Sequence, residues 1–306
     1  MPQDPAGLVL QLAATEPRCV AQHLGPWMIE PAWFGKALAA VRAGEWPVSV
    51  EAVTQSDRRA SDYTLDADGI AIVRIIGQTQ KGESKYGGTS TIRLRRALRD
   101  AAADDAVKAV LLAVDSPGGT VAGTAELADA VTALDKAKPV FAYIEDLGAS
   151  AAYYVAAQAR RISANAAAQV GSIGTLVILE DYSAQAEQLG IKVHVVSSGP
   201  FKGAFAVGAE IPPDHIAYAQ DIVDVYAEQF NQAVKRGRNL SIGAVRELAD
   251  GRTHIGAQAK ELRLIDAVEP FDETLKQLRK EIPTPTPAAN KRARAERKIA
   301  MQELSD

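Results

Sequence analysis

Four short motifs between residues 115 and 202 carry the residue types that a serine nucleophile requires. In chain order they are Asp-Ser-Pro-Gly-Gly (115–119), Gly-Ala-Ser-Ala-Ala (148–152), Gly-Ser-Ile-Gly (171–174) and Ser-Gly-Pro-Phe-Lys (198–202). A serine hydroxyl is a poor nucleophile until a neighbouring base removes its proton. Together the motifs predict an oxyanion-binding turn, a nucleophile, a packing turn and a lysine base, in that order.

Ser150 is the predicted nucleophile. It lies between a predicted strand, 140–144, and a predicted helix, 151–159. The free N–H groups and the dipole of a helix start favour developing negative charge at this point. Small residues on both sides, Gly148 and Ala152, are typical of a sharp nucleophile turn. Taken alone, the serine would be interpreted as a helix cap, so the interpretation depends on the other motifs.

The glycine pair of the first motif is suited to binding an oxyanion. The motif follows a predicted buried strand, 107–114, and precedes a helix that begins near Thr124. Paired glycines let the backbone turn tightly and present N–H groups, and the N–H of Ala151 is a candidate second donor. The alternative is an ordinary strand-to-helix turn, which glycine and proline also mark.

Lys202 is the predicted general base. It follows a predicted strand, 193–196, and has apolar neighbours at Phe201, Ala204 and Phe205. Removal from water among such neighbours lowers a lysine pKa and leaves some neutral amine to accept a proton. The alternative is a solvated loop lysine. The histidines lie outside the glycine-rich turns and are interpreted as structural or surface residues: His23, His194, His215 and His254.

From about Gly69 to Val268, the chain resembles the signal peptide peptidase A family of Ser/Lys serine peptidases. The fold of that family is related to the Clp protease and crotonase group. Besides the four motifs, Ala-Asp-Gly-Arg (249–252) and Gly-Ala-Gln-Ala (256–259) match its pattern in order. The resemblance implies a nucleophile, a base and two oxyanion donors, which are Ser150, Lys202 and the N–H groups of Gly119 and Ala151.

Within that family the chain is most similar to phage head-maturation proteases. Ala-Ala follows Ser150, as in that branch, whereas bacterial signal peptide peptidases usually have Gly-Gly. The run Pro-Trp-Met-Ile-Glu-Pro (26–31) also looks like the start of such proteins. One departure is Arg263, which replaces the glycine of the family's Gly-Leu-Val-Asp turn. The resemblance implies a prohead endopeptidase whose substrates are capsid, portal or scaffold proteins.

Three other functions stay open. One is a bacterial cytoplasmic peptidase of the same family, and another is a catalytically silent ring or scaffold component. An acyl-CoA-processing crotonase relative is less favoured, because nothing in the chain resembles a nucleotide pocket and the Ser/Lys pair would be unexplained.

Alternating strands and helices predict the fold. This order favours right-handed crossovers and a mainly parallel sheet. We therefore expect an α/β, crotonase/Clp-protease-like fold with C-terminal helices. Predicted strands are 70–76, 107–114, 140–144, 175–179 and 193–196, and predicted helices are 91–103, 124–134, 150–159, 181–189 and a long one from Pro213 to near Arg238.

Three zones are expected along the chain. Residues 1–68 are an N-terminal extension with a short helix at 32–43, and residues 69–282 form the peptidase domain. Residues 283–306 begin with Pro-Thr-Pro-Thr-Pro and end in a basic segment, which predicts an extended linker and a solvated tail.

Composition fits an enzyme of a reducing compartment. The formal net charge of −4 gives no general attraction to nucleic acid, and Cys19 is the only cysteine. No basic leader with an apolar core and no apolar run long enough for a membrane span is visible. We therefore expect a cytoplasmic location, in the host cytoplasm or prohead interior for a phage protein. We expect no membrane or nucleic-acid partner and no cofactor or metal.

The resemblance also implies a homo-oligomer. In single-domain members of that family, the serine and lysine of one site come from neighbouring protomers. This chain has one copy of each motif and no internal repeat. We therefore expect active sites shared between copies, and a small or apolar residue before the scissile bond.

Overall fold

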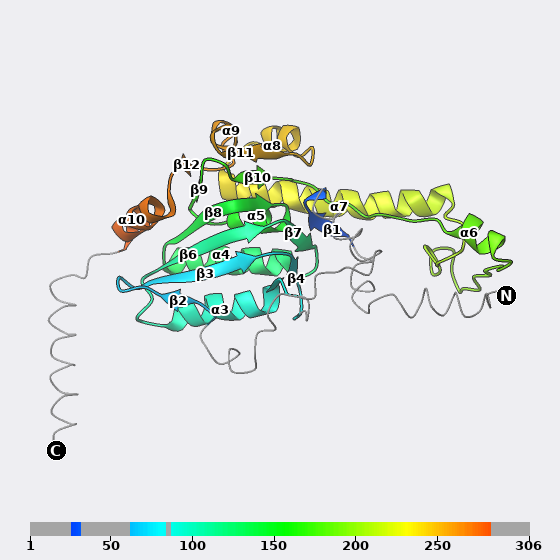
Figure 1. The fold of residues 1–306 in the computed structure, drawn as a ribbon, viewed down its shortest axis with the longest axis horizontal. Helices are drawn as coiled ribbons and strands as arrows, with labels where there is room; N and C mark the ends of the chain where they lie inside the picture. The colour runs from blue at the N-terminus through cyan, green and yellow to red at the C-terminus, as the bar shows by residue number, and fades with distance from the viewer. Residues whose placement is uncertain (1–25, 32–61, 84–86, 283–306) are drawn as a thin grey trace, which may run out of the picture.

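The computed structural model describes residues 26–31, 62–83 and 87–282, and most of them form a body around one twisted sheet (Figure 1). The strand order is β11-β10-β8-β6-β3-β2, with β9 paired to β8 and β12 paired to β9. The bounds are β2 Thr64–Leu65, β3 Ile70–Ile76, β6 Ala109–Ser116, β8 Val140–Ala149, β9 Arg161–Ala164, β10 Gln169–Gly171, β11 Thr253–Ile255 and β12 Ala267–Val268.

The sheet is mainly parallel, as predicted. β3 pairs with β6, β6 with β8, and β8 with both β9 and β10, all in parallel register. In the described part of this sheet, the antiparallel pairs are β2/β3 at one edge and β10/β11 at the other. The central strands are apolar on both faces because helices cover both sides.

Alternate residues of the central strands pack on opposite helical layers. On one face, the larger buried cluster joins the sheet to α3 (Thr91–Ala103), α4 (Thr124–Ala137), α5 (Ala151–Ala156) and the C-terminal part of α7 (Pro213–Arg238). On the other face, α10 (Phe271–Glu281) packs on β6 and β8 through a smaller cluster. The predicted helices are therefore confirmed, and they hold the carboxyl ends of the strands rigidly.

A second, small sheet lies beside the carboxyl ends of the main strands. Its order is β1-β7-β4-β5. The bounds are β1 Trp27–Ile29, β4 Thr79–Gln80, β5 Thr89–Ser90 and β7 Gly118–Thr120. β1 comes from the stretch predicted as an N-terminal extension, yet all three of its residues are buried. The predicted helix at 32–43 and the C-terminal tail lie outside the described residues.

Residues 176–225, which we call the arm, project from the body (Figure 1). The arm contains α6 (Ser183–Gln188) and the N-terminal part of α7, both predicted. The predicted strands 175–179 and 193–196 are wrong: Leu176 makes one isolated bridge, and residues 192–197 form no strand. The branched side chains there favour a strand, but no strand of the described segments lies beside them to form a ladder. The remaining described helices are α8 (Ile242–Leu248) and α9 (Gly256–Glu261).

Candidate active site

The two glycine-rich turns lie side by side. β6 and β8 run parallel, and after a shift in register Ser116 pairs with Gly148. The turns that follow these strands therefore meet at the same edge of the sheet. A Cβ atom on Gly148 would lie 2.7 Å from the Ile144 side chain, so this close approach requires glycine.

Ser150 occupies a strained strand-to-helix turn. Its backbone angles are φ 53° and ψ −122°, a conformation that non-glycine residues rarely adopt. Its N–H donates to the Gly171 carbonyl oxygen at 2.8 Å, and its side chain makes no capping hydrogen bond to α5. Ser150 is therefore the N-cap residue of α5 without a side-chain cap, and its strained backbone is of the kind found at nucleophile turns.

The Ser150 hydroxyl has no hydrogen-bond partner within the described part of the chain. Its Oγ atom is buried, and the residue is 1% exposed. An unpaired buried hydroxyl costs free energy, so native structures seldom keep one without a functional reason. The hydroxyl is therefore free to donate its proton to a group that the described residues do not supply.

The predicted oxyanion donors lie next to this hydroxyl. A Cβ atom on Gly118 would lie 2.7 Å from the Ala151 nitrogen and 2.9 Å from the Ala149 carbonyl oxygen, so the glycine turn packs directly on the nucleophile turn. The Ala151 N–H is at the first position of α5, where an N–H has no partner inside the helix. Gly119 is the next residue of the glycine turn. Both predicted donors are thus in one place.

Two contacts fix the surroundings of Ser150. The Tyr153 hydroxyl donates to the Leu264 carbonyl oxygen at 2.8 Å, and burial raises the pKa of Tyr153 above its usual range, so it remains a neutral donor. Ser172 has φ 50°, and its N–H donates to the Arg252 carbonyl oxygen. This turn anchors the loop that begins at Gly171, in keeping with its predicted packing role.

The single chain does not bring Lys202 to Ser150. Lys202 is exposed on the arm, and its neighbour Phe201 packs on Tyr218, with ring centroids 5.2 Å apart. The helix after Ser150 contacts α7 elsewhere, where the Tyr154 and Phe230 rings lie 5.0 Å apart. These two positions on α7 are roughly 18 Å apart along the helix axis. One copy therefore holds the nucleophile and lacks the predicted base beside it.

His254 is a site neighbour that sequence reasoning missed. It pairs with Val170 on β10, and a Cβ atom on Gly171 would lie 3.5 Å from its ring. Its Nε2 atom is buried without a hydrogen-bond partner among the described residues. No local pattern predicts this position, because β11 has only three residues and pairs with a strand far away in the chain. His254 is therefore a second candidate base to be tested.

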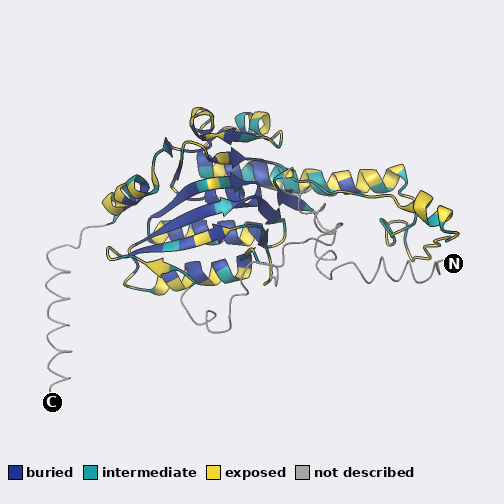
Figure 2. Ribbon diagram, in the orientation of Figure 1, coloured by how far each residue is buried: buried dark blue, intermediate teal, exposed yellow. Residues whose placement is uncertain are grey.

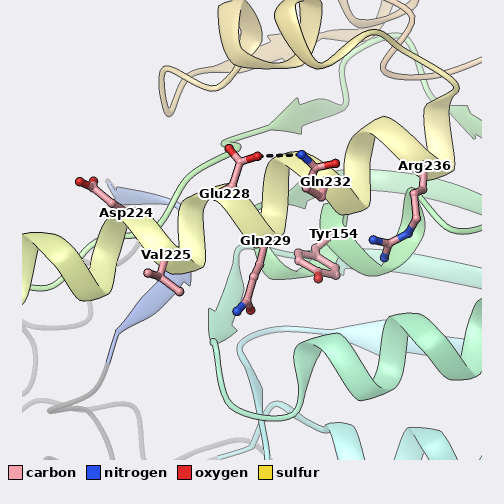
Figure 3. Close-up of a pocket in the computed structure, with 7 residues that line it drawn as sticks. All are labelled: Tyr154, Asp224, Val225, Glu228, Gln229, Gln232 and Arg236. Atoms are coloured by element: carbon pink, nitrogen blue, oxygen red, sulfur yellow. Dashed lines mark hydrogen bonds between the residues drawn. The ribbon is translucent and has the colours of Figure 1, made fainter.

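A separate groove runs along α7 at the side of the body (Figure 3). It contains neither Ser150 nor Lys202. Its lining comes from one side of α7 and from α5: Tyr154, Asp224, Val225, Glu228, Gln229, Gln232 and Arg236. Within residues 26–31, 62–83 and 87–282, no cluster of three side chains could hold a metal ion, and no helix there is long and apolar enough to cross a membrane.

The α/β fold and the strained, buried serine beside two backbone donors define a serine-hydrolase class of site. The model of peptidase family S49 matches residues 132–283. A protein of the archaeon Methanocaldococcus jannaschii with a provisional protease name is 38% identical over 181 residues, which are 59% of this chain and 58% of that protein. Capsid assembly protease C of phage lambda is 28% identical over 254 residues, 81% of this chain and 56% of the phage protein.

The head-tail preconnector protein GP5 of phage P21 is 30% identical over 182 residues, 58% of this chain and 36% of that protein. This chain spans little more than half the length of the first curated relatives it matches. Over residues 132–283, it is thus similar to peptidase family S49. The match and the mainly parallel α/β sheet confirm the expected crotonase/Clp-like fold, and the matched family is one of serine peptidases.

Proposed function

We propose that this chain is a Ser/Lys endopeptidase in which Ser150 of one copy works with Lys202 of a second copy. The observation that carries the proposal is the state of Ser150. Its backbone is strained, and its hydroxyl is buried and has no partner among the described residues, while Lys202 lies exposed on the arm. A second copy whose arm reaches this site would supply the missing amine. Residues 69–282 are the proposed catalytic domain.

The proposed reaction uses four groups. The neutral Lys202 amine removes the proton from Ser150 Oγ, which attacks the carbonyl carbon of the scissile bond. The N–H groups of Gly119 and Ala151 stabilise the negative oxygen of the tetrahedral intermediate. The intermediate collapses, the lysine ammonium protonates the leaving amine, and an acyl-enzyme forms on Ser150. Water, deprotonated by Lys202, then hydrolyses the acyl-enzyme.

The surface of the arm supports a second copy as the partner. Ten of the fourteen exposed large apolar side chains of the described residues lie within residues 176–225. A contiguous apolar surface of this kind marks an interaction site. Because the arm of one copy would meet the body of the next, the contact would be head-to-tail. Its repetition closes into a ring or runs on as a filament, and we propose the closed ring.

We propose capsid, portal or scaffold proteins of a phage prohead as the substrates, with the host cytoplasm or prohead interior as the location. The alignment with the lambda capsid assembly protease supports this: at 254 residues, it cannot fit inside residues 69–282 and must include flanking sequence. The rival is a cellular peptidase of the same family, favoured by the higher identity of the archaeal relative.

Co-expression tests the substrate class. The chain and its Ser150→Ala variant would each be produced with the capsid, portal and scaffold proteins encoded beside it, and new termini would be identified by mass spectrometry. We expect new termini in at least one of these proteins with the wild type and none with the variant. Ser150-dependent cleavage of other proteins only would favour the cellular peptidase, and no Ser150-dependent cleavage at all would contradict peptidase activity.

A further inference from the structure

β1 pairs with the strand that carries the glycine turn. The Glu30 N–H donates to the Pro117 carbonyl oxygen at 2.8 Å, and the Val121 N–H donates to the Pro26 carbonyl oxygen at 3.3 Å. In an antiparallel ladder, hydrogen-bonded pairs recur at every second residue. The pair between these two bonds joins Met28 and Gly119, so the Gly119 N–H faces the Met28 carbonyl group.

The other edge of β1 is also paired. The Trp27 N–H donates to the Leu176 carbonyl oxygen at 2.8 Å, and the Leu176 N–H donates back at 2.9 Å. β1 therefore lies between the strand of the glycine turn and the segment that follows the 171–174 turn. Peptides that bind by strand addition make this kind of main-chain contact.

The Met28 carbonyl group lies at the predicted oxyanion site. A Cβ atom built on Gly118 would lie 2.3 Å from the Met28 carbonyl oxygen and 2.7 Å from the Ala151 nitrogen, so both atoms border the same spot. The Gly119 N–H faces the same carbonyl. A scissile carbonyl must lie between two such donors.

The Met28 side chain is placed like the residue before a scissile bond. It is 2% exposed and belongs to the same buried cluster as Ala151 and Ile173. An apolar residue at this position agrees with the expectation that a small or apolar residue precedes the scissile bond. Ser150, the residue before Ala151, is itself 1% exposed.

We propose that residues 26–30 are an internal peptide that occupies the substrate strand of the active site and must leave before a protein substrate binds. This inference rests on the proposed function of Ser150. It also names a substrate class: extended peptides with an unbranched apolar side chain at the Met28 position. The opposing view is that β1 is a permanent strand of the fold, distinct from the substrate position.

A reversible cross-link tests the inference. Trp27 and Leu176 lie opposite each other on paired segments, where two cysteines can form a disulfide. Trp27→Cys and Leu176→Cys would be combined in a full chain carrying Cys19→Ser. A fluorophosphonate probe would report the reactivity of Ser150. We expect labelling to be at least about tenfold slower in the oxidised protein than in the same sample after reduction. Equal rates would overturn the proposal.

A release variant supplies the opposite test. Met28→Asp places a charge in a buried apolar position and should expel β1, raising the labelling rate at least about tenfold. A synthetic peptide of residues 26–31 should lower it again. Ile255→Asp, on an exposed position of β11, is the matched control and should label like the wild type.

The outcomes separate the two proposals. If every form labels at Ser150 at one rate, with folding verified by circular dichroism, the internal peptide is wrong and the nucleophile stands. If no form labels, including the reduced cysteine variant, the proposed function fails and the internal peptide fails with it. If Met28→Asp does not fold, the cross-link alone decides.

Discussion

The body and the arm use apolar side chains in opposite ways (Figure 2). In the body, the large apolar side chains are buried in two clusters around the sheet. In the arm, side chains such as Val196 and Val207 are 97% and 74% exposed. α7 belongs to both regions: Phe230 is fully buried, and Val225 is exposed. The body holds the nucleophile and completes its own core, whereas the arm holds the predicted base and presents a surface suited to a partner.

The largest expected effect comes from the nucleophile in the body. Ser150→Ala should lower peptidase activity by about 10³-fold or more, because no acyl-enzyme can form. Fold and assembly should persist, since the change removes one hydroxyl. Ser172→Ala is the matched control in a turn with a packing role, and it should keep more activity. A steady-state peptidase assay checks both, and substantial turnover by the Ser150 variant would reject the assignment.

Charged substitutions on the arm should break the assembly and leave the fold of the body intact. Val196→Asp combined with Val207→Asp should abolish assembly and lower activity by about 100-fold or more, since the second copy would no longer bring its lysine. The unfolding free energy of the body should change by less than about 0.5 kcal/mol, because both positions are exposed.

Light scattering and urea unfolding measure these two effects. Ile92→Asp, at an exposed position of α3 in the body, should leave assembly and activity unchanged. An arm variant that still assembles and cleaves would show that the apolar surface has another use.

The body was the predictable region. Apolar runs and glycine turns predicted β3, α3 and the positions of both catalytic turns, because local propensity and burial agree there. The arm was harder: Val193 and Val195 look like strand residues, but no strand among the described residues pairs with them. The role of β1 could not be predicted from three residues, since its partners are Gly119 and Leu176, far along the chain.

The identity of the base should decide how activity depends on pH. Activity should rise from neutral toward alkaline pH, because a lysine must lose its proton before it can act as a base. An imidazole base would give a rise around its ordinary pKa of about 6.5. Lys202→Ala should lower activity by about 10³-fold, and His254→Asn should keep the alkaline profile. A pH–rate profile checks this, and the reverse pattern would make His254 the base.

The smallest expected effect concerns Arg263 in the body. Its φ is 61°, a left-handed conformation that costs a non-glycine residue about 1 kcal/mol. Arg263→Gly should raise the unfolding free energy by about 0.5 kcal/mol, since the greater freedom of glycine in the unfolded chain offsets part of that strain. Urea unfolding measures it. A loss of stability would show that the Arg263 side chain has a stabilising contact.

Mixing two inactive proteins tests most directly whether body and arm of different copies share one site. Ser150→Ala subunits keep the lysine and Lys202→Ala subunits keep the serine. After subunit exchange in equal amounts, about a quarter of the sites should pair an intact serine with an intact lysine, and about a quarter of the wild-type activity should return. If exchange is demonstrated with labelled subunits and no activity returns, the site is not shared between copies.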